Sequence, residues 1–105
     1  MVTHSSIQAA VQLLSKAAPA STIILFGSYA RGDARENSDL DFLVVEPEVT
    51  ARRKEMVRLS DVLRPLHIPV DILVVSRKTY QEWSQTPGTV LYAAAKEGKI
   101  LYAAA

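Results

Sequence analysis

The hydrophobic residues of this 105-residue chain follow two periodicities, one helical and one extended. Between Ser5 and Ala18, apolar side chains recur every three or four residues, which predicts an amphipathic helix. Ser5 and Gln8 fit a capping box at its start, and Pro19 ends it. The run Thr22–Phe26 is instead continuously apolar and rich in β-branched residues, which is typical of a strand covered on both faces.

The rest of the chain continues to alternate between these patterns. It predicts strands over Asp39–Val45 and Val70–Val75, helices over Thr50–Arg64, Thr79–Gln85 and Thr89–Glu97, and a short edge strand over Lys99–Tyr102. No linker or low-complexity tract divides these segments. We therefore expect one α/β domain over residues 1–105, with a small mixed sheet of three to four strands flanked by helices.

Composition and charge narrow the classes of function. The net charge is +1, so no global field draws the protein to nucleic acid or to a membrane surface. The absence of cysteine excludes disulfides and thiolate metal sites. No apolar run approaches the ~20 residues that span a bilayer, and the first residues lack the layout of a signal peptide. We expect a cytoplasmic protein without strong nucleic-acid binding.

Three aspartates stand out within the predicted strands. Asp39 and Asp41 are two residues apart, so both side chains leave one face of a strand with Cα atoms roughly 7 Å apart. Asp71 completes a cluster if its strand is the neighbour. Carboxylates in this arrangement are hard oxygen ligands suited to magnesium. The alternatives are a loop cap for Asp39 and neutralisation of the acids by arginines.

The segment Gly27–Gly32 follows the first strand as a tight turn. Ser28 is expected to cap a one-turn helix, and the N–H groups of such a turn can bind phosphate oxygens. An ordinary strand-to-helix turn uses the same residues, and no P-loop lysine follows. Arg31 is equally consistent with phosphate binding and with an ion pair to Asp33 or Glu36.

Trp83 and Tyr80 lie three residues apart on a predicted helix, on a face that either packs in the core or contacts a partner. We expect core packing.

These residues together carry a family resemblance. Gly27-Ser28, ten intervening residues and Asp39-Leu40-Asp41, with Asp71 in a later strand, resemble the nucleotidyltransferase superfamily that includes DNA polymerase β. The wording Gly-Ser-Tyr-Ala-Arg-Gly with Ser-Asp-Leu-Asp is similar to its minimal nucleotidyltransferase (MNT) branch. The likeness extends from the first strand through the third and includes the tail Glu97–Tyr102.

The resemblance implies specific roles. Asp39 and Asp41 would bind the magnesium ions, two of them, and Asp71 would help to bind metal and activate the attacking hydroxyl. Gly27 and Ser28 would hold the β- and γ-phosphates of ATP, with Arg31 and Ser38 as further nucleotide-binding positions.

MNT proteins are similar to antitoxins that transfer AMP from ATP to a tyrosine of a HEPN-domain toxin, and this activity is the function that the resemblance implies. The chain is too short to hold an accessory domain. The acceptor would therefore be recognised by a small open face, by a homodimer or by a partner protein. Two other functions stay open: an antitoxin that masks its partner without catalysis, and a transferase acting on a small molecule or an RNA end.

Overall fold

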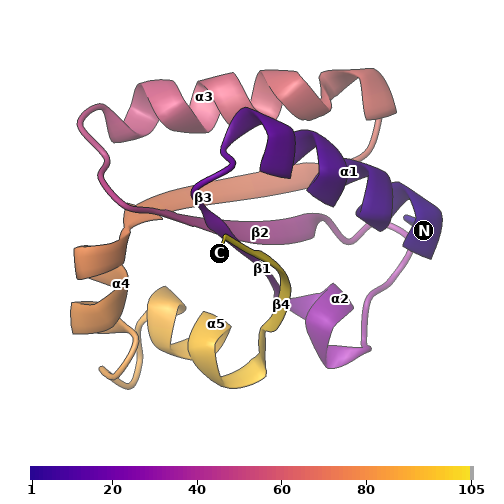
Figure 1. The fold of residues 1–105 in the computed structure, drawn as a ribbon. Helices are drawn as coiled ribbons and strands as arrows, with labels where there is room; N and C mark the ends of the chain where they lie inside the picture. Colours follow the sequence, from indigo (N-terminus) through magenta and orange to yellow (C-terminus); the bar gives the residue numbers. More distant parts are fainter. Residues whose placement is uncertain (105) are drawn as a thin grey trace.

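A four-stranded sheet with the strand order β3-β2-β1-β4 forms the centre of the molecule (Figure 1). The structure is a computed structural model that describes residues 1–104. Strands β2 and β3 are parallel, and β1 runs antiparallel to both β2 and β4. This mixed sheet with flanking helices confirms the predicted fold class. The elements in chain order are α1 (His4–Ala17), β1 (Thr22–Phe26), α2 (Ser28–Arg31), β2 (Leu40–Glu46), α3 (Arg52–Leu63), the 3-10 turn η1 (Arg64–Leu66), β3 (Val70–Ser76), α4 (Arg77–Trp83), α5 (Val90–Glu97) and β4 (Lys99–Ala103).

The sheet is covered on both faces. Helices α1 and α3 lie on one face, and α4 and α5 lie on the other (Figure 1). In β2, Phe42 and Val44 pack with α1 and α3, whereas Leu43 and Val45 pack with Leu91 of α5. Successive side chains of a strand point to opposite faces, so a strand buried on both faces has a continuous apolar sequence. This arrangement explains the apolar runs of β1 and β2.

The residues that cap the helices differ from those predicted from the sequence. The Oγ1 of Thr3 accepts the N–H of Ser6 at 3.1 Å, so Thr3 caps α1 and the predicted capping box at Ser5 is wrong. The N-cap of α2 is Gly27, without a side-chain hydrogen bond, so the predicted cap at Ser28 is also wrong. Hydroxyls of Ser76 and Thr89 cap α4 and α5.

Trp83 does not pack in the core, which corrects the sequence prediction. Its relative exposure is 50%. Helix α4 begins directly after β3, so its last turn extends past the end of the sheet (Figure 1). Tyr80 still reaches the apolar cluster beneath α5, but Trp83 lies beyond it.

A pair of glutamates joins the end of β2 to α3. Burial, together with the nearby carboxylate of Glu55, raises the pKa of Glu46 to about 7. Arg58 donates two hydrogen bonds of 2.7 Å to the Glu55 carboxylate, which lowers the pKa of Glu55 to about 2. At neutral pH the two carboxylates therefore have different protonation states, and only Glu55 is fully ionised.

No helix in residues 1–104 has both the length and the apolar content to cross a bilayer.

Candidate active site

The pairing of β2 with β3 brings two of the three aspartates together. Asp41 and Asp71 are each the second residue of their strand, and they are direct neighbours in the parallel register. Neighbouring residues in register project from the same face of a sheet. Asp39 precedes β2 by one residue, so its position along the chain places it on the side of Asp41. The condition that the sequence left open, adjacency of the two strands, is met.

The surroundings of Asp41 perturb its carboxyl group. Its pKa is raised by burial and, to a smaller degree, by repulsion from Asp71 and Asp39, while Arg31 opposes the shift. Asp71 is exposed although apolar residues flank it in sequence, because it lies near the start of the edge strand β3. The site therefore has one half-buried carboxyl group beside two exposed ones.

Gly27 brings the turn after β1 into contact with Asp41. The backbone of Gly27 has φ +75° and ψ −155°, a conformation that is essentially restricted to glycine. A Cβ atom at this position would overlap the Oδ2 atom of Asp41. Glycine is thus required twice, for the backbone conformation and for the close approach. The turn and the acid pair of the sequence motif form one site.

Arg31 pairs with two carboxylates at the edge of this site. Its Nε lies 3.3 Å from Oδ2 of Asp33, and its Nη1 lies 3.1 Å from Oε1 of Glu97. Of the two ion-pair partners considered from the sequence, Asp33 is correct, whereas Glu36 makes no ion pair within residues 1–104. The partner that sequence reasoning missed is Glu97, at the end of α5. It lies 66 residues away, so no local spacing could indicate it.

The two serines differ in their surroundings. Ser28 is the first residue of α2, and it precedes the N–H groups of Ala30 and Arg31, which both bond to the carbonyl oxygen of Gly27. Ser38 closes the loop before β2, because its Oγ accepts the N–H of Arg35 at 2.8 Å. Ser28 thus lies on the turn that contacts Asp41, whereas the hydroxyl of Ser38 holds the loop that precedes Asp39.

The carboxyl groups fit magnesium in their chemistry. Their oxygens are the hard ligands that the ion prefers, and the repulsion that raises the pKa of Asp41 is relieved by a neighbouring cation. Within the described residues, no three acidic or histidine side chains already converge as a metal-ligand group. Like charges repel, and a cation between the carboxylates would offset that repulsion.

Comparisons with known proteins agree with this geometry. Residues 7–101 match the family model described as "Nucleotidyltransferase domain". A relative from Methanocaldococcus jannaschii, named "Putative protein adenylyltransferase MJ0141", is 40% identical over 52 residues, which are 50% of this chain and 52% of the relative. The chain therefore spans about half the length of this curated relative.

Solved structures share the fold over nearly the whole chain. A toxin–antitoxin complex with AMP-PNP aligns with a TM-score of 0.60 at 24% identity, covering 97% of this chain and 74% of that one. An MntA–HpeT toxin–antitoxin complex aligns with a TM-score of 0.63 at 22% identity, covering 98% of this chain and 74% of that one. A tri-AMPylated HEPN toxin of Shewanella oneidensis in complex with MNT antitoxin aligns with a TM-score of 0.60 at 20% identity, covering 94% of this chain and 71% of that one.

At these identities the structural likeness concerns the fold, whereas the family model covers most of the sequence. The chain belongs to the nucleotidyltransferase domain family.

Proposed function

We propose that this chain transfers AMP from ATP to a tyrosine hydroxyl of a partner HEPN toxin, with Mg²⁺ as cofactor, and thereby acts as an antitoxin. The observation that carries the proposal is the contact between the Gly27 turn and Asp41, with Asp71 beside Asp41 in register. This arrangement sets a phosphate-binding turn against paired carboxylates. It is the juxtaposition that nucleotidyl transfer requires.

Each residue has a defined task in the proposed reaction. The main-chain N–H groups at the start of α2 bind the β- and γ-phosphates, and Ser28 adds its hydroxyl. Arg31, near Asp41, contributes positive charge toward the triphosphate. Asp39, Asp41 and Asp71 would hold two magnesium ions, which supply charge neutralisation at the attacking and departing oxygens.

Bond changes are confined to the α-phosphate. The acceptor oxygen forms a bond to the α-phosphorus, the bond from that phosphorus to the bridging oxygen breaks, and pyrophosphate leaves. The proton of the acceptor hydroxyl goes to the Asp71 carboxylate. Asp71 is exposed, so an acceptor from another molecule can reach it. Positioning by the turn and the strands provides most of the rate.

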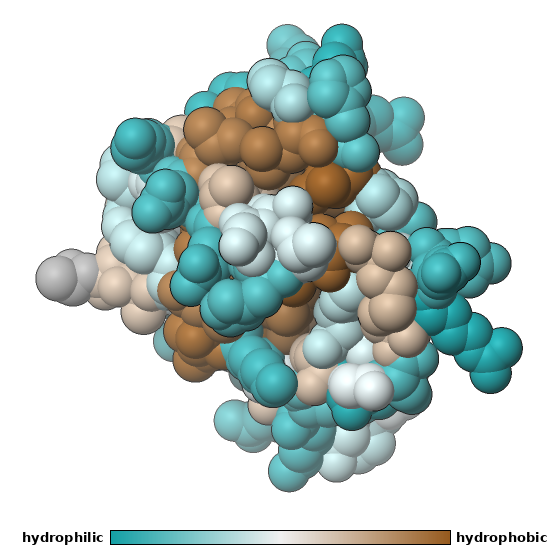
Figure 2. Space-filling model, turned by 90° about the vertical axis from the view of Figure 1, so that its right-hand side faces the viewer, coloured by the Kyte–Doolittle hydropathy of each residue, from teal (hydrophilic) through white to brown (hydrophobic). Residues whose placement is uncertain are grey.

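The charge of the chain favours a protein acceptor over an RNA end. Figure 2 faces the end of the molecule where α2 and the start of α1 lie, and it shows hydrophobic patches among hydrophilic side chains. This mixture is common to protein surfaces, so it does not by itself distinguish the two acceptors. A net charge of +1 offers little of the phosphate neutralisation that an RNA acceptor needs.

A transfer assay tests the proposal. The chain is incubated with ATP labelled on its α-phosphate, magnesium and the HEPN-domain protein encoded beside it, and label on that protein is measured. The matched control carries Asp39→Asn and Asp41→Asn, which keep side-chain size and remove both charges. Equal labelling by the two forms, or none by either, contradicts the proposed activity. If the double variant still silences the toxin in cells, masking is the mechanism instead.

A further inference from the structure

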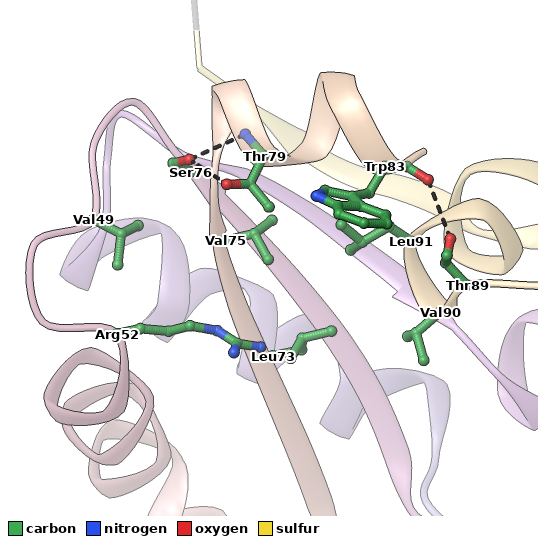
Figure 3. A pocket seen from close by; sticks show the side chains of 10 residues that line it. All are labelled: Val49, Arg52, Leu73, Val75, Ser76, Thr79, Trp83, Thr89, Val90 and Leu91. Atoms are coloured by element: carbon green, nitrogen blue, oxygen red, sulfur yellow. Dashed lines mark hydrogen bonds between the residues drawn. The ribbon is translucent and has the colours of Figure 1, made fainter. Parts of the chain in front are cut away.

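A hollow of the molecule lies away from the acids. A cavity of about 520 Å³ opens between β3, α4 and α5, near the end of β3 (Figure 3). Leu73, Val75 and Leu91 provide an apolar floor, whereas the acids lie at the opposite end of the strands. The proposed transfer reaction places none of its groups in this cavity.

The rim carries two of the most exposed large apolar side chains. Trp83 is 50% exposed and Val90 is 55% exposed. The carbonyl oxygen of Trp83 accepts a hydrogen bond of 3.1 Å from Oγ1 of Thr89, which ties the end of α4 to the start of α5 (Figure 3). This bond fixes the main chain that carries the indole. The side chain itself is suited to an anchor, because aromatic side chains lose little conformational entropy on contact.

The charge of the cavity is positive. Among the described residues that line it, Arg52 is the one charged residue, and its Nε donates a hydrogen bond of 2.8 Å to the carbonyl oxygen of Val74. Within residues 1–104, Arg52 forms no ion pair, unlike Arg31, Arg58 and Arg64.

We propose that this cavity docks an apolar segment of the partner protein that is flanked by a carboxylate. The apolar floor and Trp83 would receive the hydrophobic side chain, and Arg52 would meet the flanking acid. The proposal rests on the proposed function only for the identity of the partner.

Docking at this position connects with the site of transfer. Leu73 and Val75 lie two and four residues beyond Asp71, so their Cα atoms are roughly 7 and 13 Å from it along one face of the strand. A segment seated in the cavity is therefore within a few residues of the carboxylates. One partner can occupy the cavity while presenting its hydroxyl to the acids.

Trp83 supplies the reporter for the test, because it is the only tryptophan of the chain. The chain is labelled with 5-fluorotryptophan, and its single ¹⁹F resonance is followed while the unlabelled HEPN-domain protein is added. We expect the resonance to shift with the partner and to stay unchanged with magnesium and a non-hydrolysable ATP analogue alone. A shift with the nucleotide alone overturns the proposal and assigns the cavity to the nucleoside. No shift with either also overturns it.

Variants locate the effect. Trp83→Ala and Arg52→Glu should each weaken partner binding about tenfold or more in calorimetry, as loss of a central anchor does. The matched control Arg53→Glu makes the same charge reversal at the next residue, which does not line the cavity, and should change affinity less than about twofold. Equal weakening by Arg52→Glu and Arg53→Glu contradicts a specific site.

The outcomes separate this proposal from the proposed function. If the partner shifts the Trp83 resonance but receives no AMP, the docking proposal is supported and the transfer proposal is contradicted. If AMP is transferred while the resonance and the affinities stay unchanged, the transfer proposal is supported and the docking proposal is contradicted.

Discussion

Replacement of Gly27 by alanine tests the contact on which the proposed site depends. The substitution places a Cβ atom on a backbone with φ +75° and ψ −155°, and that atom overlaps Oδ2 of Asp41. The matched control is Gly32→Ala, five residues later. Gly32 also has a positive φ, +84°, but within residues 1–104 no atom beyond its chain neighbours lies within 4 Å of an added Cβ. The first variant combines strain with overlap, and the second introduces strain alone.

The magnitudes follow from these two terms. A left-handed conformation costs an L-residue about 1–2 kcal/mol, which is the expected effect of Gly32→Ala. The conformation of Gly27 costs about 1–3 kcal/mol, and forced displacement of the Asp41 carboxylate adds about 1–3 kcal/mol. Gly27→Ala should therefore destabilise the fold by about 2 kcal/mol more than Gly32→Ala. For a domain of this size, such a difference lowers the Tm by about 10 °C.

Urea unfolding at neutral pH measures both variants, with the double variant Gly27→Ala and Asp41→Ala as the third arm. Removing the Asp41 carboxylate should recover the part of the free energy of unfolding that was lost to the overlap, about 1–3 kcal/mol. The loss from backbone strain should remain. If Gly27→Ala costs no more than Gly32→Ala, or if the Asp41 substitution restores nothing, the turn does not press against Asp41 and the reasoning is refuted.

Three other changes have outcomes fixed by the structure. Because the folded state raises the pKa of Glu46 to about 7, its stabilising contribution is complete below about pH 4.5 and is lost as the pH rises through 7. Without solvent screening, this pKa shift would correspond to about 3 kcal/mol of free energy of unfolding, and for this partly exposed side chain we expect about 1 kcal/mol. Urea unfolding at pH 5 and pH 8 should show that loss in the wild type and not in Glu46→Gln. A non-hydrolysable ATP analogue with magnesium, at about a hundred times its Kd, should stabilise the protein by about 2.7 kcal/mol, and Asp41→Ala should abolish the rise in Tm; unchanged wild-type melting argues against a formed site. Leu59→Ala, at a fully buried position of α3, should cost about 2–5 kcal/mol, whereas Val57→Ala, at a 55% exposed position, should stay within about 0.5 kcal/mol; similar losses would contradict the packing of α3.

Much of the local structure followed from the sequence, because it depends on nearby residues. The apolar run Thr22–Phe26 is β1, with bounds as predicted, and the predicted helix over Ser5–Ala18 lies within a residue of α1. The caps were less predictable. A serine three residues before a glutamine fits a capping box, but Thr3, two residues earlier, makes the cap. Several hydroxyl residues compete at such a start, and the sequence does not rank them.

The residue types of the candidate site could be predicted from the sequence, but the contacts between residues far apart in the chain could not. Spacing alone placed Asp39 and Asp41 on one side of a strand, since side chains alternate with a period of two. Adjacency of Asp71 depended on the choice of β3 as the parallel neighbour of β2, a contact between segments 30 residues apart. Glu97 joins Arg31 across 66 residues for the same reason. Pairing between distant segments is decided by how the whole core packs.

The strands, the helices, the glycine turn and the aspartates of the motif could be predicted from the sequence, because local backbone preferences and side-chain periodicity suffice for these. Three features became known only from the packed fold: Gly27 lies against Asp41, Asp71 is the neighbour of Asp41, and Trp83 lies at the rim of a cavity instead of in the core. Exposure and long-range contact depend on where elements end relative to the sheet, and a local pattern does not contain that information. Tyr80 and Trp83 therefore differ in burial although they have the same local pattern: Tyr80 packs against the apolar cluster, whereas Trp83 is exposed.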